Sequence, residues 1–314
     1  EPGLYVIAVS GGVDSMVLFD MLQNRAGISL VVAHVDHGIR PDSHMDRELV
    51  ARVAMSHNVP FEYVELNLGP GVSEETARSA RYKFLRHTKG TYAADAIITA
   101  HHNDDLLETA IINMSRGTGW RGLSSLRSTS EIVRPLLHVT KAEIMAYANK
   151  HALEWREDST NADLRYLRNR IRRHVQSRDS EHNARILREI IVRQNKLAKQ
   201  IDQAMQAWLS ANVTQAKGAI ALPRYQLIML PENVAHELLQ AVLRRVSGKS
   251  LPRPLVARAL LFCKVAKAGK AMPLGANLCL RVTRREVIVE PSTNVVSLGN
   301  ARGSFLLSQQ LNED

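Results

Sequence analysis

Residues 6–15 read Val-Ile-Ala-Val-Ser-Gly-Gly-Val-Asp-Ser, an apolar β-branched run that breaks at two glycines. A helical pattern then begins near Met16. Glycines let the backbone approach an anion closely, and a helix N-terminus presents unpaired N–H groups and the positive end of its dipole. The stretch therefore predicts a phosphate-binding loop, in which Ser10 and Ser15 supply hydroxyl donors.

This loop differs from the commoner phosphate loops. It has no Lys-Ser or Lys-Thr pair, and the dinucleotide spacing G-x-G-x-x-G is absent. Because Asp14 would repel bare phosphate, we expect a divalent cation to accompany the nucleotide. An ordinary strand-to-helix turn rich in small residues is the alternative interpretation.

The loop resembles the signature of the PP-loop ATP pyrophosphatases, which split ATP between its α and β phosphates to adenylate a substrate. The resemblance implies ATP as a substrate, with Mg²⁺, and an adenine nucleotide alpha-hydrolase-like fold. The residues expected to bind ATP are Ser10, Gly11, Gly12, Val13, Asp14 and Ser15.

Length and composition narrow the class of protein. A chain of 314 residues can bury a full core and is expected to hold two domains or more. With no apolar run long enough to cross a bilayer and no secretory leader, it is expected to be cytoplasmic, with no membrane partner. The two cysteines, Cys263 and Cys279, argue against a disulfide framework or zinc cluster and are both expected in the core.

The net charge of +10 is spread unevenly along the chain. Residues 1–100 carry nine Lys/Arg against twelve Asp/Glu, whereas residues 165–200 carry eleven against three. Such a basic stripe is the footprint expected for a polyanion, because each neutralised phosphate releases a counterion. The alternative is a solvated helix face.

Strand-like and helical patterns alternate in the first part of the chain. This alternation predicts an α/β fold with a doubly wound parallel sheet, in which ligands bind beyond the carboxyl ends of the strands. The strands are expected at about 5–9, 29–36, 61–66 and 95–100, and the helices at roughly 15–24, 44–57, 74–88 and 104–115.

The rest of the chain suggests further parts. We expect a catalytic domain over 1–180, a helical linker over 181–217, a small α/β domain over 218–290 and a tail over 291–314 without periodicity. Residues 137–176 look helical, with Thr140 as an N-cap and a turn at 158–161. The small domain shows helices near 232–246 and 253–267, followed by a hairpin of 278–282 with 287–290.

Polar residues gather where the expected strands end. They are His34-Val-Asp36-His37 after the second strand, Arg78 and Arg81 on the helix after the third, and His101-His-Asn-Asp104-Asp105 after the fourth. One interpretation is a transition-metal site of a hydrolase, with imidazole and carboxylate ligands from His34, Asp36, His37, His101, His102, Asp104 and Asp105. Alternatively, Asn103 caps a helix whose dipole stabilises Asp104 and Asp105. Beside a phosphate loop, however, the carboxylates suit Mg²⁺ or a substrate ammonium.

Six ordered motifs between residues 34 and 172 resemble the tRNA(Ile)-lysidine synthetase family, and the resemblance spans about residues 5–290. They are His-x-Asp-His-Gly at 34–38, Glu-Glu-x-x-Arg-x-x-Arg-Tyr at 74–82, His-His-x-Asp-Asp-x-x-Glu-Thr at 101–109, Arg-Gly-Thr-Gly-x-x-Gly-Leu at 116–123, Arg-Pro-Leu-Leu at 134–137, and Asp-Ser-Thr-Asn with Arg-Asn-x-Ile-Arg at 158–172. The family often shows Gln where Leu106 stands here, so that position receives no role.

The resemblance implies a ligase that attaches L-lysine to C2 of the wobble cytidine in an isoleucine tRNA with a CAU anticodon. ATP first adenylates the base and releases pyrophosphate, and the lysine amine then displaces AMP. A carboxylate, Asp36 or Asp105, is a candidate base. The implied catalytic residues are Asp36, Asp104, Asp105 and Arg81, with Asp14 and Asp104 as Mg²⁺ ligands. The implied substrate pocket holds His34, His101, Glu108, Arg116, Gly117, Thr118 and Gly119, and the implied tRNA contacts are Arg168, Arg170, Arg172 and Arg173.

Other interpretations remain at this stage. A tRNA thiolase would need reactive cysteines near the loop, and residues 1–262 contain none. For an amide-forming synthetase the basic stripe would be surplus, whereas an RNA-binding protein with an inactive nucleotide site would keep it. The sequence also allows a homodimer.

Overall fold

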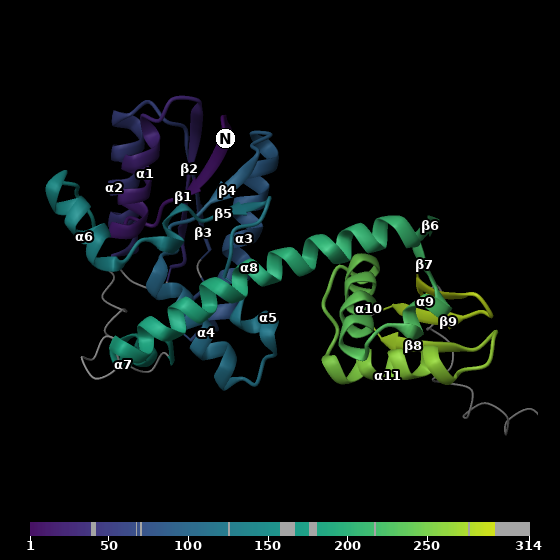
Figure 1. The fold of residues 1–314 in the computed structure, drawn as a ribbon. Coiled ribbons are helices and arrows are strands. Elements are labelled where there is room, and N and C mark those ends of the chain that lie inside the picture. The colour runs from purple at the N-terminus through teal and green to yellow at the C-terminus, as the bar shows by residue number, and fades with distance from the viewer. Residues whose placement is uncertain are drawn as a thin grey trace, which may run out of the picture. The chain divides into compact units, whose positions relative to one another are not determined.

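The structure, a computed structural model, describes residues 1–38, 42–66, 68–69, 71–124, 126–157, 167–175, 181–216, 218–275 and 277–292. The chain divides into two compact units, Glu1–Lys199 and Gln200–Asp314, here called the first and the second unit (Figure 1). The domain limits expected from the sequence remain a proposal. None of the helices in the described ranges combines the length and the apolar content that a bilayer span needs.

The first unit is built on a parallel five-stranded sheet of order β3-β2-β1-β4-β5. In this register Val6 of the central strand lies beside Val31 on one side and Ile97 on the other. The phosphate loop therefore leaves the middle of the sheet. The strands are β1 (Gly3–Ala8), β2 (Ile28–Asp36), β3 (Phe61–Glu65), β4 (Ala96–Ile98) and β5 (Ile132–Val133).

Helices cover both faces of this sheet, as Figure 1 shows. Ile7 and its side-chain neighbours on one face pack against α1 (Val13–Gln23), α2 (Ser43–Ser56) and α6 (Lys141–Lys150). Val6, on the opposite face, packs against α3 (Glu74–Thr91). Because side chains alternate along a strand, a strand that is apolar on both faces must be covered on both faces. The expected doubly wound fold is confirmed.

The remaining helices of this unit follow β4. They are α4 (Asn103–Ser115), α5 (Trp120–Leu123), the 3₁₀ helix η1 (Pro135–His138) and α7 (Leu167–Val175). Residues 137–176 are therefore helical only in parts, and the turn expected at 158–161 lies outside the described residues.

Two of the expected helix starts are wrong. Helix α1 begins at Val13, not near Met16, because β1 already ends at Ala8 and Gly12 serves as N-cap. The N-cap of α4 is His102, not Asn103. Its Nδ1 accepts a hydrogen bond from Asp104 N, while an Asp105 oxygen accepts one from His102 N. Thr140 is confirmed as the N-cap of α6, with Glu143 completing a capping box.

Helix α8 (Glu181–Asn212) crosses the division between the units, and it matches the expected long helix of 181–212. The second unit then forms an antiparallel sheet of order β6-β7-β10-β9-β8, whose inner face packs on the helices of that unit. Its elements are β6 (Thr214–Ala216), β7 (Ala219–Pro223), α9 (Arg224–Met229), α10 (Glu232–Ser247), α11 (Arg253–Val265), β8 (Ala271–Gly275), β9 (Leu278–Val282) and β10 (Glu286–Pro291).

The two cysteines differ in their surroundings. Cys263 is fully buried in the second core, where burial raises the pKa of its thiol to about 12. Cys279 is only half-buried, because it lies on the sheet face opposite Leu278 and Leu280. The expectation that both lie in the core therefore holds for Cys263 alone.

Candidate functional site

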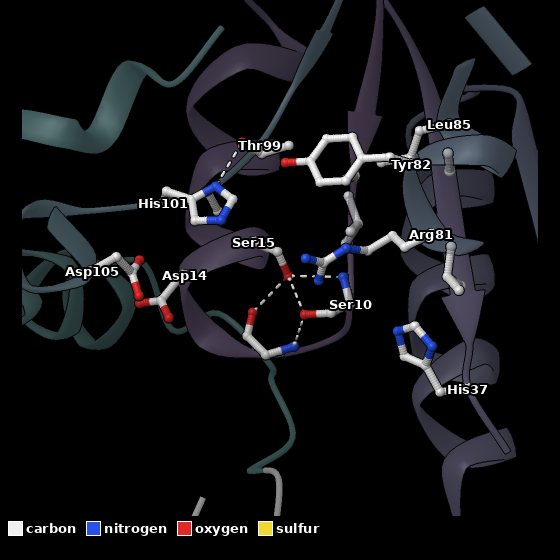
Figure 2. Close-up of a pocket in the computed structure, with 16 residues that line it drawn as sticks. Ser10, Asp14, Ser15, His37, Arg81, Tyr82, Leu85, Thr99, His101 and Asp105 are labelled. Carbon is white, nitrogen blue, oxygen red and sulfur yellow. Dashed lines mark hydrogen bonds between the residues drawn. The ribbon is translucent and has the colours of Figure 1, made fainter. Parts of the chain in front are cut away.

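A cavity of about 360 Å³ opens at the carboxyl edge of the parallel sheet (Figure 2). Segments far apart in the sequence line it, because the carboxyl ends of parallel strands meet at one edge. The lining side chains include Ser10, Asp14 and Ser15 after β1, His37 after β2, Arg81 and Tyr82 of α3, and Thr99, His101 and Asp105 around the start of α4.

The phosphate loop forms one wall of this cavity. Gly11 has φ +89°, in the left-handed region that favours glycine, and Gly12 caps α1 without any side-chain hydrogen bond. The Ser15 hydroxyl donates to the Gly12 carbonyl at 2.9 Å and accepts from Ser10 N at 3.1 Å. The loop is thereby closed on itself while the first turn of α1 faces the cavity.

Two carboxylates converge on His102 at the acidic side of the cavity. His102 Nε2 lies 3.8 Å from an Asp14 oxygen and 3.7 Å from an Asp105 oxygen. Because Nδ1 accepts a backbone N–H, the proton of a neutral imidazole sits on Nε2 and faces both acids. Asp14 also accepts a hydrogen bond of 2.6 Å from Lys141 of α6.

Asp105 is ionised in this setting. Burial alone raises the pKa of its carboxyl, since burial disfavours charge. The neighbouring groups His102, His101 and Arg168, together with the backbone N–H of His102, outweigh burial and hold the pKa of Asp105 below its ordinary value. The site thus keeps a carboxylate that can attract a cation.

Arg81 supplies positive charge on the other side. Figure 2 shows its guanidinium pointing toward the side chains of Ser10 and Ser15. It lies 5.6 Å from the Tyr82 ring, and the acid whose charge acts on it is Glu74, which itself forms an ion pair with Arg168. Burial lowers the pKa of Arg81, and the positive charges of Arg78 and Arg168 add to this effect, against the opposing influence of Tyr82 and Glu74. An anion bound at the loop would supply a counterion.

His101 is held neutral between these two sides. Its Nδ1 lies 2.9 Å from the Thr99 hydroxyl. Burial lowers the pKa of His101 to about 3, against the opposing effect of Asp105 and with help from nearby arginines. At neutral pH the imidazole is therefore an uncharged hydrogen-bonding group in the cavity wall.

Two residues predicted for the site lie beside it with their polar atoms occupied. Both oxygens of Asp36 accept hydrogen bonds, from Gly38 N at 2.8 Å and the Ser43 hydroxyl at 3.0 Å. His34 is buried, and its Nδ1 donates to the Val9 carbonyl at 2.9 Å. Burial lowers the pKa of His34. Neither side chain lines the cavity; each fixes the end of a strand that does.

The basic stripe divides at α7. Arg168 and Arg172 turn inward, and both bond the fully buried Glu108, at 2.9 and 2.6 Å. Arg170 and Arg173 are exposed on the same helix. The structure therefore gives the four arginines two different environments.

Asp104 is also engaged, by Arg188 of α8 at 2.9 Å, and it does not line the cavity. The predicted loop of Arg116, Gly117, Thr118 and Gly119 is exposed and contributes none of the lining residues. Thr118 donates to the Asn113 carbonyl at 2.8 Å, which closes the turn after α4. The structure does not bring these residues to the cavity.

Sequence reasoning assigned no role to several residues that shape this site. Tyr82 lines the cavity although only its motif was noted, and His37 lines it although it was considered only as a ligand of a transition metal. Lys141 lies 127 residues from Asp14, and Arg156 contacts Gly11 from a similar separation. Only a three-dimensional structure reveals such pairs, since neither lysine nor arginine stands in a pattern that marks it.

The donor set of the cavity suits Mg²⁺ better than a transition metal. In the described ranges, no group of three or more His, Cys, Asp or Glu side chains could hold a metal ion. Asp14 and Asp105 nevertheless bring two carboxylates to one point of the cavity wall. Mg²⁺ is commonly held by one or two carboxylates together with substrate phosphates, so these residues fit the ion.

A parallel sheet whose central strand ends in a glycine loop and a helix N-terminus defines a nucleotide-binding α/β protein. The family model described as the PP-loop domain matches residues 2–179. That range is more than half of the sequence, and the chain belongs to the PP-loop family.

The chain is also similar in sequence to curated proteins named tRNA(Ile)-lysidine synthase. The chain is 40% identical to the tRNA(Ile)-lysidine synthase of Solibacter usitatus (strain Ellin6076) over 169 residues, which cover 53% of this chain and 38% of that protein. It is 33% identical to the tRNA(Ile)-lysidine synthase of Wolbachia pipientis wMel over 261 residues, 77% of this chain and 60% of that protein. These matches confirm the resemblance seen in the six motifs. The chain spans less than two thirds of the length of these relatives.

A solved structure supports the fold. The U34-tRNA thiolase NcsA from Methanococcus maripaludis, determined with its [4Fe-4S] cluster, superposes with a TM-score of 0.52 at 16% identity. The superposition covers 63% of this chain and 73% of that chain. At this identity the likeness concerns the fold alone.

Proposed function

We propose that this protein uses ATP to attach L-lysine to C2 of the wobble cytidine of isoleucine tRNA. The observation that carries the proposal is the cavity itself, which the glycine loop, the cation Arg81 and the carboxylates of Asp14 and Asp105 line together. The names of the curated relatives, tRNA(Ile)-lysidine synthase, point to the same reaction.

In the first step the loop binds the phosphates of ATP. Backbone N–H groups at the start of α1 and the hydroxyls of Ser10 and Ser15 contact phosphate oxygens, and Arg81 neutralises part of their charge. Mg²⁺, held by Asp14 and Asp105, supplies further neutralisation when bound. The cytidine O2 attacks the α-phosphorus, the bond to the bridging oxygen breaks, and pyrophosphate leaves.

In the second step the lysine amine replaces the activated oxygen. Lysine arrives as an ammonium, which an ionised carboxylate attracts, and it must lose a proton before it can attack. Asp105 is the candidate acceptor because it is ionised and lines the cavity, whereas Asp36 does not line it. The amine then bonds to C2, and AMP leaves with the former O2.

Sulfur transfer fits the chain less well. A thiolase needs reactive thiols, and thiolate character is what makes a cysteine reactive. Both cysteines lie in the second unit, and burial raises the pKa of Cys263 to about 12.

The direct test is mass analysis of isoleucine tRNA transcripts incubated with the protein, ATP, Mg²⁺ and lysine. We expect the tRNA to gain the mass of one lysine less one water, with release of pyrophosphate and AMP. Omission of lysine, or a transcript with another base at the wobble position, serves as the control. Unmodified tRNA in the presence of a protein that binds ATP would overturn the proposal.

The exposed arginines of α7 are proposed to hold the tRNA, together with the small domain over 218–290. Replacing Arg170 and Arg173 by Ala should weaken tRNA binding at low salt and reduce the slope of log affinity against log salt by about 1–2. Binding of ATP should stay unchanged. Unaltered tRNA binding would identify this face of α7 as a merely solvated surface.

A further inference from the structure

The peptide between Gly11 and Gly12 has a defined orientation. The Gly11 carbonyl accepts a hydrogen bond of 3.0 Å from the backbone N–H of Arg156. In a trans peptide the carbonyl and the following N–H point in opposite directions. The contact with Arg156 therefore turns the Gly12 N–H to the other side, where in the ligand-free protein it donates a long hydrogen bond of 3.4 Å to Ser10 Oγ in the cavity wall.

The Arg156 side chain anchors this contact to α2. Its Nε donates to Asp46 at 2.7 Å, and a terminal nitrogen donates to Asp42 at 3.2 Å. Asp46 is itself buried and packs on the loop, since a Cβ added to Gly11 would lie 3.3 Å from the Asp46 Cβ. Gly11 is thus held between the start of α2 on one side and Arg156 on the other.

We propose that Arg156 is a positioning residue for nucleotide binding. The hydrogen bonds of its side chain to Asp42 and Asp46 hold the backbone N–H of Arg156 against the Gly11 carbonyl. This contact keeps the Gly12 N–H aimed at the phosphates. With the peptide reversed, the Gly11 carbonyl oxygen would face the phosphates and repel them. The inference rests on the proposed function in one respect, namely that this loop binds the phosphates of ATP.

The chain offers a matched control. Arg52 of α2 pairs with Glu154 through two contacts, 2.8 and 2.9 Å, and so joins α2 to the segment that carries Arg156. Both side chains are more than 60% exposed, and neither lines the cavity. Arg52→Met therefore removes an ion pair between the same two segments without touching Gly11.

The experiment measures ATP binding at equilibrium without tRNA, and hydrogen exchange of the loop amides in the ligand-free protein. For Arg156→Met we expect ATP to bind about tenfold to a hundredfold more weakly, because misplaced donors lose their geometry. The amides of residues 10–16 should exchange faster. Arg52→Met should change neither quantity, and Arg156→Lys, which keeps the charge but not the fork, should lie between.

Two results would overturn the inference: ATP binding by Arg156→Met as tight as that by Arg52→Met, or unchanged exchange of the loop amides. If Arg156→Met does not fold, Arg156→Lys and Asp46→Asn undergo the same measurements with the same criteria. Failure of the proposed function has a different signature, since the wild-type protein would then bind ATP but leave the tRNA mass unchanged.

Discussion

The environment of Arg81 favours a bound anion in the cavity. A partly buried cation next to other arginines destabilises the protein that carries it, and a bound phosphate would relieve that cost. We expect Arg81→Met to weaken ATP binding by roughly 1.5–3 kcal/mol, the range for hydrogen bonds to charged groups. The same change should raise the melting temperature of the ATP-free protein. Calorimetry with and without ATP measures both effects.

Arg86 provides the comparison for that substitution. It belongs to the same helix and lies 5.8 Å from the same Tyr82 ring, but it pairs with Glu131 and is half exposed. Arg86→Met should leave ATP binding unaltered. Equal losses of ATP affinity in the two variants would show that Arg81 acts only through packing of α3.

His101 predicts a dependence of stability on pH. Its pKa is about 3 in the folded protein against an ordinary 6.5, so between these pH values the unfolded chain binds a proton that the folded chain does not bind. The stability associated with neutral His101 is complete above about pH 6.5 and is lost as pH falls toward about 3. Between about pH 7.5 and about pH 5, the free energy of unfolding in urea should decrease less for His101→Gln than for wild type. Equal decreases would contradict the assignment.

At the residue scale, sequence patterns located the loop, Arg81, His101 and Asp105, since each stands in a motif at a strand end. They could not separate the roles of Asp104 and Asp105. These neighbours on a helix point in different directions, and the partner that occupies Asp104 is Arg188, 84 residues along the chain. The side-chain fork of Arg156 is likewise a consequence of tertiary folding.

At the scale of elements, α7 shows why a charge count does not identify a binding surface. Arg168 and Arg172 are four residues apart and share one helix face, which meets Glu108. Arg170 and Arg173 fall on the other face. The sequence establishes that the helix is basic, but only the position of a buried acid on α4 reveals which arginines are already paired.

Removal of that acid should be costly. Glu108→Gln leaves Arg168 and Arg172 beside a neutral amide, and loss of one partner from a buried ion pair costs about 3–5 kcal/mol. Glu131→Gln, which breaks the exposed pair with Arg86, should cost less than about 1 kcal/mol. The free energy of unfolding in urea tests both. Similar values for the two variants would mean that α7 does not depend on Glu108.

The long elements were predictable and the short ones were not. Strands β1 to β4 and helices α1 to α4 match the alternation of apolar patterns within a few residues. The two-residue β5 is too short for any period to show. Strand β8 contains Pro273 and Gly275, residues that disfavour an interior strand and here accompany an irregular register with β9.

At the scale of the whole molecule, each unit has a core of its own. Leu239 is fully buried in the second unit and Leu107 in the first. We expect scanning calorimetry to resolve two unfolding transitions. Leu239→Ala should reduce the free energy of unfolding for one of them by about 2–5 kcal/mol, and Leu107→Ala should do the same for the other. ATP should raise only the transition that Leu107→Ala lowers. A single transition that shifts in both variants would show that the units unfold together.

The strand order β3-β2-β1-β4-β5 also carries a consequence for synthesis of the chain. Strand β1 can pair with β2 early in synthesis, but its other edge stays unpaired until β4 has been made. Asp95, which accepts a hydrogen bond from Leu4 N just before β4, lies 91 residues further along the chain. Until then the ribosome-bound polypeptide exposes an unpaired β-edge and has only half of its nucleotide pocket. We therefore expect ATP to stabilise folding intermediates that contain β4 but not earlier ones, and we expect a chain interrupted before β4 to be open to misassembly.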